Sequence, residues 1–244
     1  MRAGRKPMDA ETYKNLSAIS VATVTMQLLK RGIRNISMVG VRPLNDPVQR
    51  ILGPAYTLRY VPLREDLSTP DVLGKPDYPP RLAIEQAPGG SVLVIDGRGR
   101  GDLAVVGDLL VERLKVRGVA GVVSDGGVRD CVEALAVGLP LYAAGPAAPA
   151  SVAGHAAADI ETAIQCGGVA IFPGDIIIGD ADGVAVIPQA LTAEVAQDGV
   201  EQERYERFAK LKIQEGRPIP GVYPPNEATK AEYAEWLKAG EPES

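Results

Sequence analysis

Histidine, cysteine and aromatic residues are scarce in this chain of 244 residues. It contains one His and two Cys, and aromatic residues make up 5% of it. A structural zinc site takes four ligands, mostly from Cys and His, so three such residues cannot complete one without carboxylates. Two cysteines in so long a chain do not form a disulfide framework. The low aromatic content also disfavours a stacking surface for single-stranded nucleic acid.

An overall excess of positive charge is absent too. The chain has 26 Lys and Arg against 31 Asp and Glu, a net charge of -5, with a pI near 5.1. Such a balance argues against a protein that neutralises a phosphate backbone. Residues 1–50 alone carry nine basic and three acidic side chains. We interpret this local bias as a solvated helix face, so no nucleic-acid partner is predicted.

Long apolar runs are also missing. The basic residues 1–10 are not followed by the apolar segment of a signal peptide, and no stretch approaches the ~18 apolar residues of a membrane span. Hydrophobic residues nevertheless make up 45% of the chain, enough to bury the core of one large domain with appendages. The sequence therefore predicts a cytoplasmic protein with no membrane partner.

The middle of the chain is rich in short strands. Helices are expected first over 9–16 and 22–31, where Gly32 ends the second. Short apolar or alternating runs then predict strands over 36–41, 55–61, 91–95, 119–124, 139–142, 169–171, 176–178 and 184–187. Only two helices, over 107–117 and 132–137, separate them. This pattern favours an α/β fold with a mixed sheet and helices at its sides, not strictly alternating strands and helices.

The last part of the chain is helical and charged. A long helix is expected over 190–214, ended by Gly216, and a Pro-rich connector follows it. Asn226 then offers an N-cap for a last helix that reaches Lys238. The predicted organisation is a core with N-terminal helices over 1–188 and a C-terminal helical arm over 189–244. The arm is expected to pack on the core or on a neighbouring subunit.

Two segments carry the strongest chemical signal. Gly107-Asp108 opens a helix directly after an apolar stretch, so the amides of Leu109 and Leu110 lie at a helix N-terminus that can hold a carboxylate. The second segment, S-D-G-G-V-R-D over 124–130, follows an apolar strand, and its two glycines predict a tight turn with unusual backbone angles.

That turn delivers Arg129 and Asp130 side by side. Arg is a forked donor for a carboxylate or enolate oxygen, and Asp is a hard oxygen ligand for Mg²⁺ or Mn²⁺. A simpler interpretation stays open from the residues alone. In it, Asp108 only caps its helix, and Arg129 and Asp130 form an ordinary ion pair on a surface turn.

A resemblance connects the two segments. The runs G-P-A-Y-T-L, A-V-V-G-D-L-L, G-V-A-G-V-V-S-D-G-G-V-R-D and P-G-D-I-I-I-G-D-A-D-G-V-A-V-I-P resemble the RraA-like family over about residues 18–200. That family contains divalent-metal-dependent 4-hydroxy-4-methyl-2-oxoglutarate aldolases and regulators of ribonuclease E. The resemblance implies a swivelling β/β/α domain that assembles as trimers or as dimers of trimers.

The resemblance also implies roles for individual residues. Arg129 would bind the pyruvyl unit of a 2-oxo acid, and Asp130 would ligate Mg²⁺ or Mn²⁺. The segment from Gly107 through Leu109 and Leu110 would hold the substrate carboxylate. Asp108 would orient a water that carries the proton. A neighbouring subunit would add an acidic residue, for which Glu203 is the best candidate, with Glu201 and Glu206 as competitors.

The implied reaction is cleavage of a carbon–carbon bond next to a pyruvyl group, which leaves an enolate. Decarboxylation of oxaloacetate generates the same enolate and is expected as a second activity. Two alternatives stay open: a non-catalytic regulator that binds a protein such as ribonuclease E, and a lyase or dehydratase of a sugar-derived acid. Many family members carry S-D-A where this chain has Thr25-Met26-Gln27, which leaves the substrate unassigned.

The other conspicuous residues receive structural interpretations. His155 is expected to be structural or exposed, and Arg64 to Asp66 to lie in a solvated loop. Asp180 and Asp182 are interpreted as a hairpin turn, because the calcium-loop pattern is incomplete. No Lys stands in an apolar pocket at a strand end, so Schiff-base chemistry has no support in the sequence.

Overall fold

The chain begins with two short helices that are fixed by their own side chains. A computed structural model describes residues 8–66 and 68–242. The expectation that the basic residues 1–10 do not begin a signal peptide concerns mainly residues 1–7, which lie outside the described range. Helices α1 (Ala10–Ala18) and α2 (Val21–Lys30) form where the sequence predicts them. Asp9 and Ser20 cap them, accepting hydrogen bonds from the backbone N–H of Thr12 and Thr23 respectively.

A mixed eight-stranded sheet forms the centre of the molecule. Its order is β1-β7-β5-β3-β2-β12-β13, and β9 also pairs with β2. Strands β2, β3, β5 and β7 run parallel, whereas β1, β9, β12 and β13 pair antiparallel with their neighbours. The bounds are β1 (Arg42–Pro43), β2 (Ile51–Pro62), β3 (Val92–Asp96), β5 (Gly121–Ser124), β7 (Leu141–Ala143), β9 (His155–Ile160), β12 (Ile176–Asp180) and β13 (Gly183–Ile187).

Alternating side chains place this sheet between apolar layers on both faces. Leu93 and Ile95 of β3 join the cluster beneath α3 (Pro79–Gln86), α4 (Asp108–Val116) and α5 (Cys131–Ala136). Val92 and Val94 of the same strand join a second cluster with β10 (Ile164–Cys166) and β11 (Val169–Ile171). Because successive residues of a strand point to opposite faces, a continuous apolar strand such as β3 is buried on both sides.

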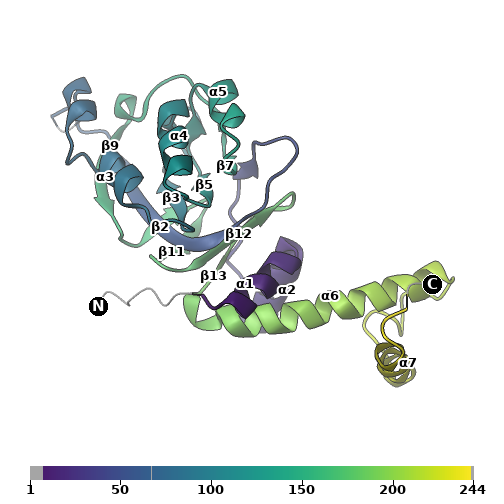
Figure 1. Cartoon of the computed structure of the whole chain (residues 1–244). Coiled ribbons are helices and arrows are strands. Elements are labelled where there is room, and N and C mark those ends of the chain that lie inside the picture. The colour runs from purple at the N-terminus through teal and green to yellow at the C-terminus, as the bar shows by residue number, and fades with distance from the viewer. Residues whose placement is uncertain (1–7, 67, 243–244) are drawn as a thin grey trace.

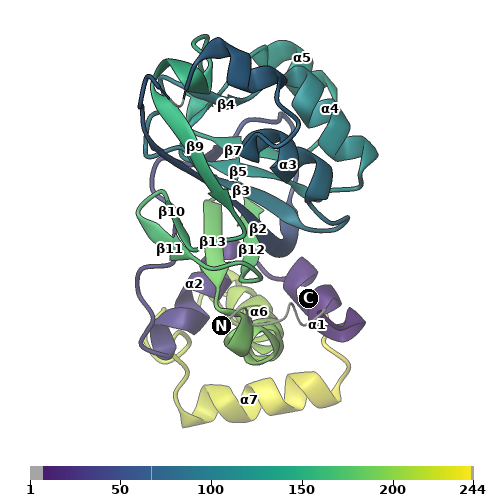
Figure 2. The same cartoon turned by 90° about the vertical axis from the view of Figure 1, so that its left-hand side faces the viewer.

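A third apolar cluster joins β12 and β13 to the terminal helices. Ile176 and Ile178 pack with residues of α1, α2 and α6 (Thr192–Gln214). In Figure 1 these helices lie on the opposite side of the molecule from α3, α4 and α5, and the C-terminal half of α6 extends beyond the sheet. Helix α7 (Glu227–Lys238) crosses α6 at the far end, as Figure 2 shows. Among the described residues, no helix combines the length and hydrophobicity needed to cross a membrane.

A small parallel sheet stands beside the main one and carries the predicted site. It consists of β4 (Ala104–Val106), β6 (Gly127–Val128) and β8 (Gly145–Pro146), in that order. Three short 3-10 helices complete the regular elements of the described chain: η1 (Pro70–Gly74), η2 (Ser151–Ala153) and η3 (Gln189–Leu191).

The predicted α/β fold, with N-terminal helices and a C-terminal helical arm, is confirmed, but single elements differ. The strand expected over 36–41 is wrong, because only Ser37 forms a bridge, to Ala185 of β13. Val39 instead donates its amide to the Gly167 carbonyl, and Gly40 turns the chain with a φ of 78°. Helix α3 and strands β9 and β10 were not expected from the sequence.

Candidate active site at the start of α4

Helix α4 begins without a side-chain cap. Its N-cap residue, Gly107, is extended, and no side chain from residues 8–66 or 68–242 caps the first turn. The carbonyl of Gly107 accepts hydrogen bonds from the amides of Leu110 and Val111, both at 3.1 Å. Within the described chain, no hydrogen bond engages the amides of Asp108 and Leu109. These two amides, together with the positive end of the helix dipole, form a binding position for an anion.

Strand pairing brings the second segment to this helix. Val106 pairs with Val128, and the amide of Arg129 donates to the carbonyl of Val106 at 3.0 Å. The glycines before Arg129 allow close packing instead of an unusual turn. A Cβ on Gly126 would lie 2.8 Å from Val105 Cγ1, and neither it nor Gly127 has a positive φ. The expectation of unusual backbone angles at these two glycines is therefore wrong.

Arg129 crosses directly over Gly107. A Cβ added to Gly107 would lie 2.9 Å from Arg129 Cγ and 3.4 Å from Asp130 Oδ2. Real Cβ atoms essentially never approach so closely, so only glycine leaves room for this side chain at the helix start. The structure therefore places Arg129 and Asp130 against Gly107, next to Asp108 and Leu109. The amide of Leu110, also predicted to hold the carboxylate, donates to the Gly107 carbonyl instead.

Asp130 has a strained backbone. Its φ of 50° and ψ of 46° lie in the left-handed region, where a non-glycine residue is uncommon. It is the N-cap residue of α5, yet its side chain makes no capping hydrogen bond. Backbone strain that a glycine would relieve, at a residue whose carboxylate does not serve the helix, supports a functional role for that carboxylate.

The charges of Arg129 and Asp130 stay accessible. Arg129 Nε donates to Asp130 Oδ2 at 3.0 Å, and the side chains are 48% and 44% exposed. No other hydrogen bond is formed by either side chain with the described residues. The guanidinium thus keeps its terminal donors, and Asp130 keeps Oδ1, for groups from outside the chain.

The donor set limits which metal this site can hold. No group of three or more His, Cys, Asp or Glu side chains gathers in the part of the chain that the structure describes. A metal at Asp130 would therefore have no more than two such ligands from the described chain, with substrate oxygens and waters as its other ligands. Mg²⁺ tolerates such a sphere, because it usually keeps several waters and binds one or two carboxylates.

Glu203 is a residue of α6, and its side chain contacts the start of α2 in the same chain instead of the predicted site. Its Oε1 accepts hydrogen bonds from Ser20 N, Ser20 Oγ and Thr23 Oγ1, at 3.0, 3.0 and 2.7 Å. Partial burial opposes ionisation of this carboxyl, but the hydrogen bonds from Ser20 and Thr23 outweigh it and lower its pKa. Its competitors are bonded as well: Glu201 accepts from the Tyr233 hydroxyl, and Glu206 from the Tyr223 hydroxyl.

In the S-D-A pattern the missing acidic residue falls on Met26, which is 41% exposed, and the neighbouring Gln27 contacts α6. Gln27 is buried and donates to Gln202 Oε1 at 2.7 Å, and Arg31 donates to Gln27 Oε1 at 2.9 Å. The bond to Gln202 joins α2 to α6.

The residues to which the sequence assigned structural roles lie in the core, in a hairpin turn and on an exposed loop. His155 is fully buried in β9, and burial, with Arg98 and Arg100 nearby, lowers its pKa to about 4. Asp180 and Asp182 form the hairpin turn between β12 and β13. Arg64 and Asp66 pair with each other on an exposed loop.

The sequence did not assign a role to Asp125. This carboxylate is 5% exposed and accepts from the amides of Gly97, Gly99 and Gly167 and from Gln165 Nε2. It thereby fixes two loops behind the turn that holds Arg129. The sequence did contain a signal for this role, since an Asp directly after a buried strand can accept hydrogen bonds from the amides of neighbouring loops.

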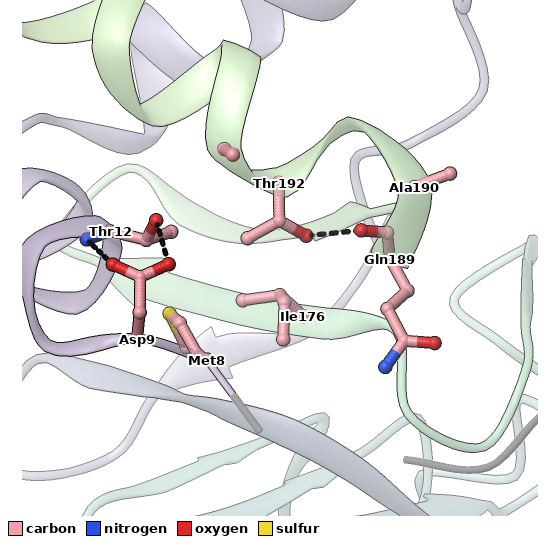
Figure 3. Close-up of a pocket in the computed structure, with 8 residues that line it drawn as sticks. Met8, Asp9, Thr12, Ile176, Gln189, Ala190 and Thr192 are labelled. Atoms are coloured by element: carbon pink, nitrogen blue, oxygen red, sulfur yellow. Dashed lines mark hydrogen bonds between the residues drawn. The ribbon is translucent and has the colours of Figure 1, made fainter. Parts of the chain in front are cut away.

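A separate cavity of about 320 Å³ lies between α1, β12 and the start of α6 (Figure 3). Met8, Asp9, Thr12 and Ile176 line one side of it. Two pairs of residues in its lining are hydrogen-bonded: Thr12 donates to Asp9, and Thr192 Oγ1 donates to the Gln189 carbonyl. It contains none of the predicted site residues.

Fold and site together define an α/β protein with an arginine–aspartate turn against an uncapped helix start. Residues 14–186 match the profile of the RraA-like family, described as aldolase/RraA. Because this match covers most of the chain, the protein belongs to the RraA-like family.

Individual relatives differ in what they are named for. A Halalkalibacterium halodurans protein, provisionally named 4-hydroxy-4-methyl-2-oxoglutarate aldolase, is 36% identical over 166 residues, or 68% of this chain and 72% of the relative. Protein DlpA of Legionella pneumophila is 30% identical over 75% of this chain, a match that spans only 28% of that longer protein.

A solved structure shares the fold as well. RraAS2 of Streptomyces coelicolor, described as an unusual member of the RNase ES inhibitor RraA family, matches with a TM-score of 0.74 at 29% identity. The match covers 84% of this chain and 98% of that one.

Proposed function

We propose that this protein is a divalent-metal-dependent lyase that acts on a 2-oxo acid through an enolate of pyruvate. The observation that carries the proposal is the contact of Arg129 and Asp130 with Gly107 at the uncapped start of α4. Similarity to the Halalkalibacterium protein supports an aldolase, since that relative's name is that of a carbon–carbon lyase.

The helix start would bind the substrate carboxylate. The amides of Asp108 and Leu109 donate to its oxygens, and the amide of Leu110, which already donates to Gly107, can share its hydrogen. This contact fixes the 2-oxo group on the side of the helix that Arg129 crosses. The terminal nitrogens of Arg129 then donate to the oxygen on which negative charge develops.

Bond cleavage also requires proton transfer and charge neutralisation. Asp108 is the first residue of α4, only partly buried, and no hydrogen bond of its side chain to a described residue occupies it. It would hold the water that takes the hydroxyl proton and returns one to the enolate carbon. Asp130 would hold Mg²⁺ or Mn²⁺, which supplies positive charge beside the enolate when bound.

Exposed apolar residues beside the site support an assembly of several subunits. Leu109 is 77% exposed and Val132 is 79% exposed, and they lie in the first turns of the two helices that frame Arg129 and Asp130. A neighbouring copy would cover them, in a trimer or a dimer of trimers. Glu203 of the partner subunit stays our candidate for the additional acidic group, with its Oε2 as the atom that Ser20 and Thr23 leave open.

A regulator that binds a protein partner is the second candidate function. The similarity to RraAS2 favours it, because that protein is described as a member of an inhibitor family. The geometry of Arg129 and Asp130 serves either function, so only an activity measurement separates them.

The test is release of pyruvate from oxaloacetate and from 4-hydroxy-4-methyl-2-oxoglutarate. The protein is incubated with Mg²⁺, with and without EDTA, and with EDTA followed by excess Mn²⁺. We expect pyruvate formation that EDTA suppresses and added metal restores. Activity that survives EDTA would remove the metal from the proposal, and silence with a panel of 2-oxo acids and sugar-derived acids would favour the regulator.

A further inference from the structure

A second hollow opens where two parallel strands of the main sheet end. Its volume is about 560 Å³, and it lies beyond the carboxyl ends of β3 and β5. The carboxyl ends of parallel strands are the usual location of ligand sites in α/β proteins. Its polar lining comes from Asn35, Arg98, Asp125 and Gln165, and the rest is mostly glycine backbone.

Arg98 has a left-handed backbone in this hollow, with a φ of 58°. The amides of Gly97 and Gly99 donate to Asp125, and the amide of Arg98 itself donates to Asp96 at 2.9 Å. These bonds hold the loop in place whatever side chain residue 98 carries. A glycine would adopt this conformation freely, whereas another residue costs about 1 kcal/mol or more. The arginine side chain is therefore not explained by the loop's own conformation.

No carboxylate of the described chain neutralises the Arg98 side chain. Among the described residues, its one hydrogen-bond contact is from Nη1 to His155 Nδ1, at 3.5 Å. Arg100, two residues further along, is fully paired with a carboxylate. It donates from Nε and Nη2 to both oxygens of Asp102, each at 2.7 Å. The same loop thus contains one fully paired arginine and one whose forked donors stay available.

The acidic groups near Arg98 are occupied by other donors. Asp125 accepts four hydrogen bonds, and Gln165 Nε2 donates to both Asp125 and Asp96, at 3.0 and 2.7 Å. Asn35 donates from Nδ2 to the Gly168 carbonyl, which leaves its Oδ1 as an acceptor that faces no described donor. The hollow therefore offers a forked cationic donor and a neutral acceptor, beside one carboxylate, Asp125, whose oxygens are already hydrogen-bonded.

We propose that this hollow is a binding site for a small hydroxy carboxylate. Arg98 donates to the carboxylate, and Asn35 Oδ1 accepts from a hydroxyl of the same molecule. The site is distinct from the one proposed for catalysis, because none of its lining residues belongs to that site. Asp125 and Arg129 precede and follow β6, so the two sites lie at opposite ends of one short strand. The proposal does not depend on lyase activity.

The test uses malate as the probe, on the full chain with no divalent metal added. All variants carry Arg129→Ala, which removes the side-chain donor of the other anion site. We expect malate to bind in this background, as followed by calorimetry or by NMR shifts. Adding Arg98→Gln is expected to weaken binding about tenfold or more, the loss of one charge-assisted contact. The matched control Arg100→Gln, in the same loop, should change the Kd by less than about twofold.

A third variant keeps the proposal testable if Arg98→Gln perturbs folding. Arg98→Gly relieves the left-handed backbone, so its Tm should equal or exceed that of the parent while malate binding is lost. Absence of malate binding in the parent, or unchanged binding in either Arg98 variant, would overturn the site. Inorganic phosphate binding more tightly than malate would overturn the assignment to a carboxylate.

Discussion

Helices α2 and α4 both begin beside acidic side chains, but only α2 has its first amides paired. At α2, Ser20 Oγ accepts from Thr23 N, Asp180 accepts from Val21 N at 2.8 Å, and Glu203 accepts from Ser20 N. At α4, a glycine stands at the N-cap and the amides of Asp108 and Leu109 have no such partner in the described chain.

This difference separates a structural helix start from one that can bind a ligand. Each α-helix leaves its first amides unpaired, and a carboxylate from the same chain or from outside can satisfy them. The chain supplies its own carboxylates at α2, which joins that helix to β12 and α6. At α4 it supplies none and places Arg129 across the open end instead.

The largest effect is expected at the open helix start. Arg129→Ala removes the proposed donor for the enolate oxygen and Asp130→Ala removes the proposed metal ligand, so each should lower kcat for pyruvate release about a thousandfold. Arg100→Ala, which breaks only an exposed ion pair, is the control and should keep near-normal turnover. Near-normal turnover of either site variant would contradict the assignment of α4 as the ligand-binding helix.

Gly107→Ala tests whether the contact across α4 positions Arg129. The new Cβ displaces the arginine stem, and a shift of about 1 Å at a reacting group costs about 100-fold in kcat/KM. Gly74→Ala is the matched control, because nothing lies within 4 Å of the added Cβ there. Equal kcat/KM for the two glycine variants would show that the close approach has no functional consequence.

A buried polar atom without a partner should act on stability instead of activity. His155 Nε2 has no hydrogen-bond partner among the residues that the structure describes, and the folded-state pKa of about 4 lies below the ordinary 6.5. Between these values the unfolded chain binds the proton more strongly, so stability falls as the pH drops from about 6.5 to 4.

The variant His155→Phe should remove this part of the pH dependence. The effect is on the order of 2 to 3 kcal/mol at pH 4, from the pKa difference. Urea unfolding of both proteins at pH 4.5 and pH 7 measures it. An identical pH dependence in wild type and variant would show that His155 does not stay neutral in the folded protein.

The smallest effect is expected at the paired helix start. Glu203→Ala removes the acceptor for Ser20 and Thr23 and should lower the free energy of unfolding by about 1 to 2 kcal/mol. Glu11→Ala, at an exposed position in the first turn of α1, should cost only a few tenths. Glu203→Gln separates the two roles of this residue. A fall in kcat at unchanged Tm would support its role in the partner's site, and a fall in Tm alone would restrict it to α2.

Local patterns made much of the site predictable. The start of α4 and the V-R-D turn could be located because glycine, charge and apolar runs alternate there within a few residues. Strand β9 was missed because its sequence, H-A-A-A-D-I, has three alanines and only one of the β-branched residues that identify strands. Its pairing with β2, about a hundred residues earlier in the chain, decides its structure instead.

The partner of Glu203 could not be predicted for a related reason. The sequence shows that this residue lies on a long polar helix, but not which element packs against that face. Ser20 and Thr23 are about 180 residues away in the chain. The same holds for Gly107, whose contact with Arg129 depends on the pairing of β4 with β6.

Strand β2 has a consequence for how the molecule folds. Residues 51–54 of β2 pair with β12, residues 55–59 with β3, and residues 58–62 with β9. One continuous strand therefore pairs with β12, β3 and β9. If the strands on one side of β2 separate from it, the strands on its other side lose part of the sheet that they pack with. We therefore expect the core to unfold as one cooperative unit. Pairing across more than a hundred residues also implies slow refolding, since loop closure precedes the contacts that stabilise it.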